Sequence, residues 1–323
     1  MTNSWLRSLP ELHDDHVESC GGKAANLGKL TKLGVNVPPG FCVLAEALTA
    51  TLEENGLIAP IESATRQLDF DSFEAIEAGT AEIRGMIANA LLPASLRDGI
   101  AAAYRDLVSS ANPYVAVRSS VAVKDSAISS FPGMMDTYHY VVGEDDVLDK
   151  VRECWASLWS ARAAYLRHHK RIPHHQNVIA PVIQLMVNPD TAGVLFTANP
   201  VTKDRGEIMI EANWGLGESV VSGRSMNDYF VIDKDGLGLR QRKIARKTLC
   251  VVMDDGRGSG RVERPVPPHL AEKPTLSDGQ LRELAETGMR IERAYGFSVD
   301  VEWAYQGPTL FILQARKIRD LQD

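Results

Sequence analysis

The segment Ser298-Val299-Asp300-Val301-Glu302-Trp303-Ala304-Tyr305 is followed, after a short turn, by Thr309-Leu310-Phe311-Ile312-Leu313-Gln314-Ala315-Arg316. Both segments alternate in the manner of strands, and Gln306-Gly307-Pro308 between them is turn chemistry, so the pair predicts a β-hairpin. Because successive strand side chains point to opposite faces, Asp300 and Glu302 share one face of their strand. Gln314 and Arg316 likewise share a face of the partner strand.

The predicted hairpin brings two carboxylates, an amide and a guanidinium together. Hard oxygen ligands hold Mg²⁺, and the planar fork of arginine matches phosphate oxygens. The pattern therefore indicates a divalent cation bound to a polyphosphate. A solvated hairpin face with a surface ion pair is the alternative, and the hairpin taken alone favours it.

Composition narrows the class of protein. The chain has 323 residues and a formal net charge of −7, and no basic patch dominates, which argues against a nucleic-acid or membrane-surface protein. The start lacks a basic region followed by a long apolar run, so we expect a cytoplasmic location. The cysteines (Cys20, Cys42, Cys154 and Cys250) are scattered without a C-x-x-C pair, which predicts reduced, mostly buried thiols rather than a zinc site.

The order of helical and strand patterns predicts an α+β fold of two lobes. Residues 1–190 form a helix-rich lobe with phosphate-binding loops, and residues 191–323 form a sheet-rich lobe with the metal-binding hairpin. A long amphipathic helix is predicted along residues 147–166, with its tryptophans in the core. The Gly/Pro-rich stretch 254–276 predicts a mobile surface connection.

Three further segments have the chemistry of phosphate binding. Gly21-Gly22-Lys23 opens a helix, where free N–H groups and the positive dipole end face an anion, although such a segment is often only a flexible cap. Arg118-Ser119-Ser120, followed by the small-residue loop 129–137, gives an arginine at a strand end and amides that wrap phosphates; a tight surface turn is the alternative. Trp214-Gly215-Leu216-Gly217-Glu218 is predicted to form a turn whose tight backbone is permitted by its glycines. Its Glu218 is equally well explained as an ordinary acidic residue in the first turn of a helix.

In this order the segments resemble the N-terminal nucleotide-binding module of phosphoenolpyruvate synthase and pyruvate phosphate dikinase, which rifampin phosphotransferase and the ATP-binding subunit of phenylphosphate synthase also carry. The matching segments cover nearly the whole chain: Gly21–Gly28, Arg118–Ser120, Phe131–Thr137, Gln184–Val187, Gly193–Pro200, Trp214–Glu218, Asp300–Trp303 and Gln314–Arg316.

The resemblance implies an ATP-grasp-like nucleotide-binding fold, with MgATP in the cleft between the lobes. It implies that Lys23 and Arg118 neutralise phosphates, that the loop from Gly133 to Thr137 closes over the β- and γ-phosphates, and that Gln184 lies beside the adenine or ribose. It also implies that Glu302 and Gln314 position Mg²⁺ with Asp300 near it, and that Arg316 holds the transferring phosphoryl group. Arg118, Glu302 and Arg316 are then the catalytic residues. The sequence departs from the family at Lys124-Asp125, where an acidic pair is usual, and at Asn227-Asp228, where Pro-Asp is usual.

Full-length members pass a phosphoryl group from ATP to a histidine on a swivelling domain, with AMP as the nucleotide product. The Thr-x-His-Ala-type segment that carries this histidine does not occur here, and His168-His169 and His174-His175 have the pattern of a polar exit loop. We therefore expect either an ATP-binding subunit whose partner carries the histidine, or an excised module of a longer phosphotransferase. A non-catalytic nucleotide-binding or regulatory module is the third possibility. The final acceptor and the oligomeric state are not specified by the sequence.

Overall fold

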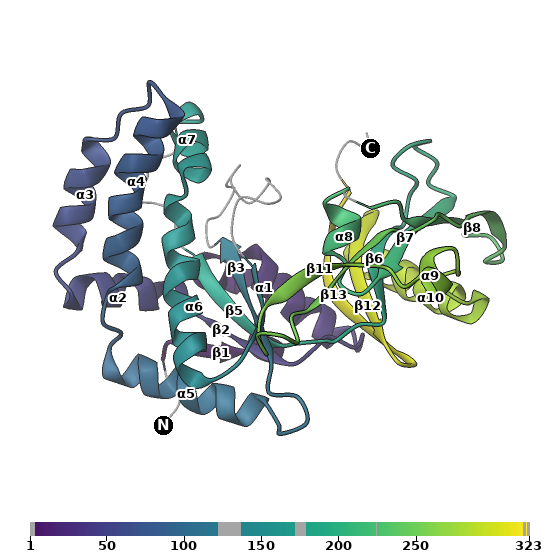
Figure 1. The fold of residues 1–323 in the computed structure, drawn as a ribbon, viewed down its shortest axis with the longest axis horizontal. Helices are drawn as coiled ribbons and strands as arrows, with labels where there is room; N and C mark the ends of the chain where they lie inside the picture. The colour runs from purple at the N-terminus through teal and green to yellow at the C-terminus, as the bar shows by residue number, and fades with distance from the viewer. Residues whose placement is uncertain (1–3, 122–136, 172–178, 224, 319–320, 322–323) are drawn as a thin grey trace. The chain divides into compact units, whose positions relative to one another are not determined.

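The computed structural model describes residues 4–121, 137–171, 179–223, 225–318 and 321 (Figure 1). The fold is α+β, as the sequence predicts. The chain divides into two compact units, one made of residues 1–29 and 39–186 and the other of residues 30–38 and 187–323. The short segment 30–38 therefore belongs with the C-terminal part of the chain.

The first unit contains an antiparallel sheet in the order β1-β2-β5-β3-β4. Its strands are β1 (Leu6–Ser8), β2 (Gly40–Val43), β3 (Val115–Val121), β4 (Thr137–Val141) and β5 (Ile179–Leu185). Its α-helices are α1 (Val17–Lys32), α2 (Ala45–Glu54), α3 (Ile58–Arg66), α4 (Phe73–Ala88), α5 (Ala94–Leu107), α6 (Glu144–Ala156) and α7 (Ala161–His169). Short 3₁₀ turns occupy Leu9–Glu11, Asp14–His16 and Ser157–Trp159.

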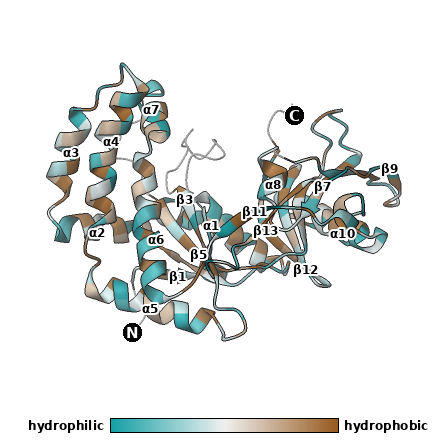
Figure 2. Ribbon diagram, in the orientation of Figure 1, coloured by the Kyte–Doolittle hydropathy of each residue, from teal (hydrophilic) through white to brown (hydrophobic). Residues whose placement is uncertain are grey.

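The core of this unit lies between helix α6 and the sheet. Val147, Val151 and Trp155 recur at helical spacing on α6 and are fully buried with Val117 of β3 and Ile183 of β5. In Figure 2 the helices of this unit alternate between hydrophobic and hydrophilic residues, as expected of helices with one face on a core. The predicted core position of the tryptophans is confirmed.

The single long helix predicted over residues 147–166 is wrong in one respect, because it is interrupted at 157–160. Ser160 has extended backbone (ψ 145°) and is the N-cap of α7. Its side chain accepts a hydrogen bond from the N–H of Ala163. Ser157 turns its hydroxyl back to the Cys154 carbonyl oxygen, 2.7 Å away. An apolar stripe predicts which face is buried, but these serines decide where the helix ends.

The second unit is built on an antiparallel sheet in the order β13-β12-β6-β7-β8-β9, beside a ribbon made of β10 and β11. The strands are β6 (Thr191–Phe196), β7 (Glu207–Trp214), β8 (Asp228–Asp233), β9 (Leu239–Lys243), β10 (Leu249–Met253), β11 (Arg261–Pro265), β12 (Val299–Gln306) and β13 (Thr309–Lys317). The helices are α8 (Glu218–Val221), α9 (Pro268–Ala271) and α10 (Asp278–Tyr295).

The segment 30–38 covers the outer edge of β13. The Asn36 carbonyl accepts from the N–H of Ile312 at 2.9 Å, and the Asn36 side-chain amide donates to the Leu310 carbonyl at 2.9 Å. An edge strand otherwise presents unpaired backbone groups, so these bonds protect the hairpin edge.

The stretch 254–276, predicted as a mobile connection, instead contains regular structure. It includes β11, which pairs with β10 from Met253↔Arg261 to Leu249↔Pro265, and the short helix α9. The ribbon contacts the turn before α8: Leu216 N–H donates to the Val251 carbonyl at 2.8 Å, and Arg261 forms an ion pair with Glu218 at 2.7 Å. The glycines and prolines fit this ribbon because they form its turn and its ends.

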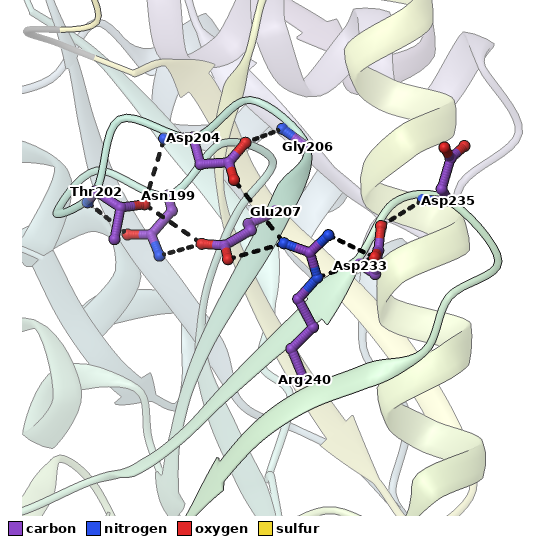
Figure 3. A network of polar contacts seen from close by, with 8 residues as sticks. All are labelled: Asn199, Thr202, Asp204, Gly206, Glu207, Asp233, Asp235 and Arg240. Atoms are coloured by element: carbon purple, nitrogen blue, oxygen red, sulfur yellow. Dashed lines mark hydrogen bonds and ion pairs between the residues drawn. The ribbon is translucent and has the colours of Figure 1, made fainter.

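One charged cluster sits at the β8–β9 end of the second sheet (Figure 3). Arg240 of β9 pairs with Asp233 at 2.6 Å and with Glu207 at 3.1 Å, and Asp204 lies 3.9 Å away. Asn199 fixes the loop between β6 and β7, because its amide donates to Glu207 at 2.8 Å and its oxygen accepts from the N–H of Val201 at 3.0 Å. Each carboxylate near Arg240 has a structural partner, so the cluster fixes the loop and the outer strand β9.

Candidate functional site

Two groups of predicted residues are brought together by the structure, one in each unit. The first, which we call the arginine group, consists of Arg118, Thr137 and Gln184, together with Lys23 of the α1 segment that lies against the end of β3. The second, the hairpin group, consists of Asp300, Glu302, Gln314 and Arg316. Gly133 lies outside the described residues, together with the loop 129–136, Lys124-Asp125 and His174-His175.

The glycine segment of α1 lies directly against the end of β3. Gly21 adopts a left-handed backbone (φ 76°), and a Cβ there would lie 2.3 Å from Ser120 Oγ and 2.6 Å from the Val121 carbonyl oxygen. Ser120 Oγ accepts a hydrogen bond from the N–H of Ala24 at 3.1 Å. Only glycine permits this approach, and the serine joins the two segments predicted to bind phosphate.

This contact changes what the helix start offers to an anion. The sequence predicts free N–H groups here, but the N–H of Ala24 already donates to Ser120. Ala24 is also fully buried, whereas Gly22 is exposed and Lys23 is half-buried. The exposed Gly22 and the half-buried Lys23 are therefore the residues that this helix start presents to an anion. Cys20, just before the glycines, is buried, and burial raises the pKa of its thiol to about 11.

Arg118 lies inside the sheet, not at an exposed turn. It is opposite Thr137 of β4 and Val182 of β5. Its Nη1 donates to Gln184 Oε1 at 3.1 Å, and Gln184 is only 2% exposed. The amide of Gln184 thus orients the guanidinium, a contact that alternation along a single strand does not reveal.

The hairpin group forms two adjacent rungs of the β12–β13 ladder. Asp300 is opposite Arg316, and Glu302 is opposite Gln314. The alternation continues on the other face, where Val299, Val301 and Trp303 are fully buried. The predicted hairpin and its division into two faces are confirmed. A register shift after Glu302 pairs Trp303 with Ile312, a bulge that the sequence does not indicate.

Within the hairpin group, Asp300 and Arg316 form an ion pair. Both Nε and Nη2 of Arg316 lie 2.7 Å from Asp300 Oδ2. The carboxylate side chain is 8% exposed and the guanidinium side chain is 36% exposed. Burial with a charged partner is the condition under which a carboxylate is tolerated inside a protein.

The sheet adds an acidic residue that sequence reasoning missed. Register places Glu302, Val194, Glu211 and Tyr229 in one row across β12, β6, β7 and β8, so their side chains share a face. Asn227 donates to Glu211 Oε2 at 3.2 Å. The available signal was a glutamate in the middle of the otherwise apolar part of strand β7.

The donor set fits a magnesium ion that is shared with a polyphosphate. Among the residues that the structure describes, no group of three or more His, Cys, Asp or Glu side chains is arranged to hold a metal by itself. Glu302 and Gln314 offer two oxygens across one rung. Mg²⁺ usually takes one or two carboxylates and fills its octahedron with phosphate oxygens and water. A site completed by the substrate agrees with these residues.

Comparison with known families identifies the group to which the chain is related. Residues 17–323 match the family described as "Pyruvate phosphate dikinase, AMP/ATP-binding domain". The chain belongs to this family. The dikinase ATP-binding family thus covers both the arginine group and the hairpin group.

Relatives of the chain carry the name phosphoenolpyruvate synthase. A probable phosphoenolpyruvate synthase from Pyrococcus horikoshii is 38% identical over 100% of this chain and 44% of its own length. The phosphoenolpyruvate synthase of Pyrococcus furiosus is 37% identical over 100% of this chain and 45% of its own length. A probable phosphoenolpyruvate synthase from Methanocaldococcus jannaschii is 38% identical over 97% of this chain and 26% of its own length. The chain thus spans less than half the length of these relatives.

No helix in the described part of the chain is both long and apolar enough to cross a membrane.

Proposed function

We propose that this chain binds MgATP and cleaves it as the ATP-binding part of a dikinase-type phosphotransferase. The phosphoryl group passes to a histidine on a separate domain or subunit, and AMP is the nucleotide product. One observation carries the proposal: in a chain of the dikinase ATP-binding family, Glu302 faces Gln314 on the rung next to the Asp300–Arg316 pair.

The hairpin group supplies the metal and phosphoryl contacts. Glu302 and Gln314 hold Mg²⁺, and Asp300 lies on the neighbouring rung. When bound, the ion screens the charge of the polyphosphate oxygens. Arg316 donates to the transferring phosphoryl group, where a partly exposed guanidinium is able to form two parallel hydrogen bonds.

The arginine group holds the remaining phosphates. Lys23 adds a point charge at the helix start, and Arg118, oriented by Gln184, donates to phosphate oxygens. Thr137 lies opposite Arg118 and lends a hydroxyl, and Gly133 belongs to the loop that we expect to close over the nucleotide. Phosphoryl transfer requires mainly such positioning and charge neutralisation.

The reaction has two acceptors, the histidine for one phosphoryl group and water or phosphate for the other. The β-phosphorus forms a bond to a histidine nitrogen and loses its bond to the α-phosphate oxygen, which leaves with AMP. The γ-phosphorus loses its bond to the oxygen that bridges it to the β-phosphorus and forms a bond to an oxygen of water or of phosphate, which gives inorganic phosphate or pyrophosphate. The histidine proton is released to solvent.

The test is quantification of ATP, ADP and AMP with the pure chain, alone and with a separately produced histidine-bearing domain of a full-length relative. We expect little turnover alone and AMP formation with the added domain. ADP as the sole product, or steady transfer to a small acceptor by the chain alone, would overturn the proposal. Nucleotide binding without AMP formation under either condition would favour a regulatory module.

Variants assign the roles. Glu302→Gln and Arg316→Ala should lower AMP formation roughly a hundredfold or more, because the first removes a carboxylate that holds the metal ion and the second removes the cation that contacts the transferring phosphoryl group. Lys23→Ala should weaken nucleotide binding more than it slows the reaction. Glu286→Gln is the matched control, since this carboxylate is exposed on α10 and pairs with Arg282. Near-normal turnover of Glu302→Gln would show that the hairpin is not the metal site.

A further inference from the structure

We infer that Asp300 is a positioning residue that orients Arg316 toward the phosphoryl group, and that it does not ligate the metal ion. The inference rests on the proposed function, and it assigns the two carboxylates of the hairpin group to different tasks. Glu302 serves the metal, and Asp300 serves the arginine.

The contact geometry supports this division. Arg316 directs Nε and Nη2 at the same oxygen, Asp300 Oδ2, with both distances 2.7 Å. A guanidinium has five N–H donors in a rigid fork, and this pairing engages one edge of it. The other edge, which carries Nη1, is thereby aimed away from Asp300. A carboxylate held in this way fixes the plane of the guanidinium.

The two side chains of this ion pair differ in how deeply they are buried. The Asp300 side chain is 8% exposed, whereas that of Arg316 is 36% exposed. The acid is therefore the anchored member, and the base is the member that a ligand is able to reach.

The backbone around Asp300 is fixed on both sides. Asp300 pairs with Arg316 on β13 and with Phe196 on β6. Just before it, Val299 exchanges two hydrogen bonds with Thr197, whose hydroxyl donates to Glu292 at 2.9 Å. Glu292 also accepts from Ser298 at 2.8 Å and from Lys234 at 2.7 Å. A rigid support of this kind keeps the Asp300 carboxylate in place, and with it the orientation of the Arg316 guanidinium.

Charge favours the same assignment. Arg316 neutralises the charge of Asp300 before any ligand binds, because its Nε and Nη2 both lie 2.7 Å from Asp300 Oδ2. If Asp300 turned to the metal, Arg316 would lose the partner that desolvates with it, which is costly at a partly buried site.

The experiment measures binding, not turnover. Dissociation constants of ATP and ADP are determined for the purified chain by calorimetry, with Mg²⁺ and with EDTA. The ratio of ATP constants without and with Mg²⁺ reports the metal contribution. The ratio of the ADP to the ATP constant reports recognition of the γ-phosphate.

Asp300→Asn should leave the metal ratio within about twofold of the wild type and lower the γ-phosphate ratio by about tenfold, the scale of one charged hydrogen bond. Arg316→Ala should do the same, and the double variant should fall no further. Glu302→Gln should instead collapse the metal ratio. Glu286→Gln should change neither ratio.

Collapse of the metal ratio in Asp300→Asn, or additive losses in the double variant, would overturn the inference while leaving the proposed function intact. If the wild type fails to bind ATP, or Glu302→Gln leaves the metal ratio unchanged, both fail. Should Asp300→Asn not fold, Asp300→Glu keeps the charge and moves the carboxylate. It should lower only the γ-phosphate ratio, and a change confined to the metal ratio would contradict the inference.

Discussion

Single side chains decide how the segments predicted to bind phosphate meet. Gly21 and Ser120 are distant in sequence, yet the glycine accommodates the serine, and the serine caps the helix that the glycine starts. Arg118 is similarly held by Gln184. The sequence indicates that these residues have phosphate-binding chemistry, but not that the serine and the amide support the groups that would touch phosphate. Such support depends on tertiary contact.

Gly21→Ala should destabilise the protein by about 2–3 kcal/mol, because the added Cβ meets Ser120 and the Val121 carbonyl and φ is positive. Urea unfolding measures the change. Gly22→Ala is the control, since a Cβ at Gly22 meets no atom within 4 Å and its backbone is not left-handed. Equal stability of the two variants would show that the close approach at Gly21 does not exist in solution.

The charged cluster around Arg240 predicts a dependence on pH. A side-chain hydrogen bond from Arg240 is the main cause that lowers the pKa of Asp233 below its ordinary value of 3.8. Because the folded-state pKa is depressed, the contribution of Asp233 to stability is present above about pH 4 and is lost as the pH falls through the folded pKa.

In Arg240→Gln the pKa of Asp233 should rise toward 3.8, as followed by the carboxyl chemical shift in an NMR titration. Arg282→Gln, which removes an exposed arginine from the Glu286 pair, should leave the Asp233 titration unchanged. An unchanged Asp233 titration in Arg240→Gln would contradict the assignment of the cause.

At the scale of elements, local patterns predicted more than long-range pairing. The β12–β13 hairpin follows from alternation and turn residues within a short stretch, but its facing pairs Asp300–Arg316 and Glu302–Gln314 depend on the register shift after Glu302. The pairing of β12 with β6 and the contact of the β10–β11 ribbon with the turn before α8 both join segments that are distant in the sequence. Neither constraint is written in the local sequence.

The elements beside that ribbon are joined by a buried charge pair. Lys247 and Asp228 have no exposed side-chain surface, and their Nζ–Oδ1 distance is 2.7 Å. Asp228 begins β8 and also accepts from the N–H of Ala245 at 3.0 Å and from the N–H of Thr275 at 2.8 Å. One carboxylate therefore connects β8 to two segments that enter and leave the ribbon.

Lys247→Met should cost about 3 kcal/mol, because it leaves a buried carboxylate without its cation. Adding Asp228→Asn should recover part of this loss, and chemical denaturation of the single and double variants measures the coupling. Arg246→Met, at an exposed neighbouring position, is the control. Additive losses would show that the two side chains do not interact.

At the scale of the whole molecule, the α+β class and the core positions were predictable, because apolar periodicity reports burial directly. The interleaving of the two units was not. Residues 30–38 lie between two stretches of the first unit in the sequence, but Asn36 bonds to β13 and the Gly34 carbonyl accepts from Arg290 of α10, which connects them to the second unit. No local composition marks such an exchange.

The reactivity of the cysteines reports how well the core of each unit excludes solvent. All four are buried and free, as expected from the sequence, and burial raises the pKa of Cys42 and Cys250 as well as that of Cys20. Thiolate is the reactive form, so at about pH 8 the native protein should react slowly with a thiol reagent. When the thiol reagent is followed by its absorbance, all four thiols should be detected only after the protein has been denatured. A thiol that reacts at once in the native protein would reveal local opening.

The path of the chain through its two units has a consequence for how the molecule comes apart. Because residues 30–38 belong with residues 187–323, a single proteolytic nick near residue 187 leaves the larger N-terminal fragment carrying a piece of the smaller fragment's own fold. We expect the two fragments to remain bound through the edge of β13, where Asn36 forms hydrogen bonds with Leu310 and Ile312. A single cut near residue 187 is therefore not expected to separate the two units, because the N-terminal fragment still supplies residues 30–38 to the second unit.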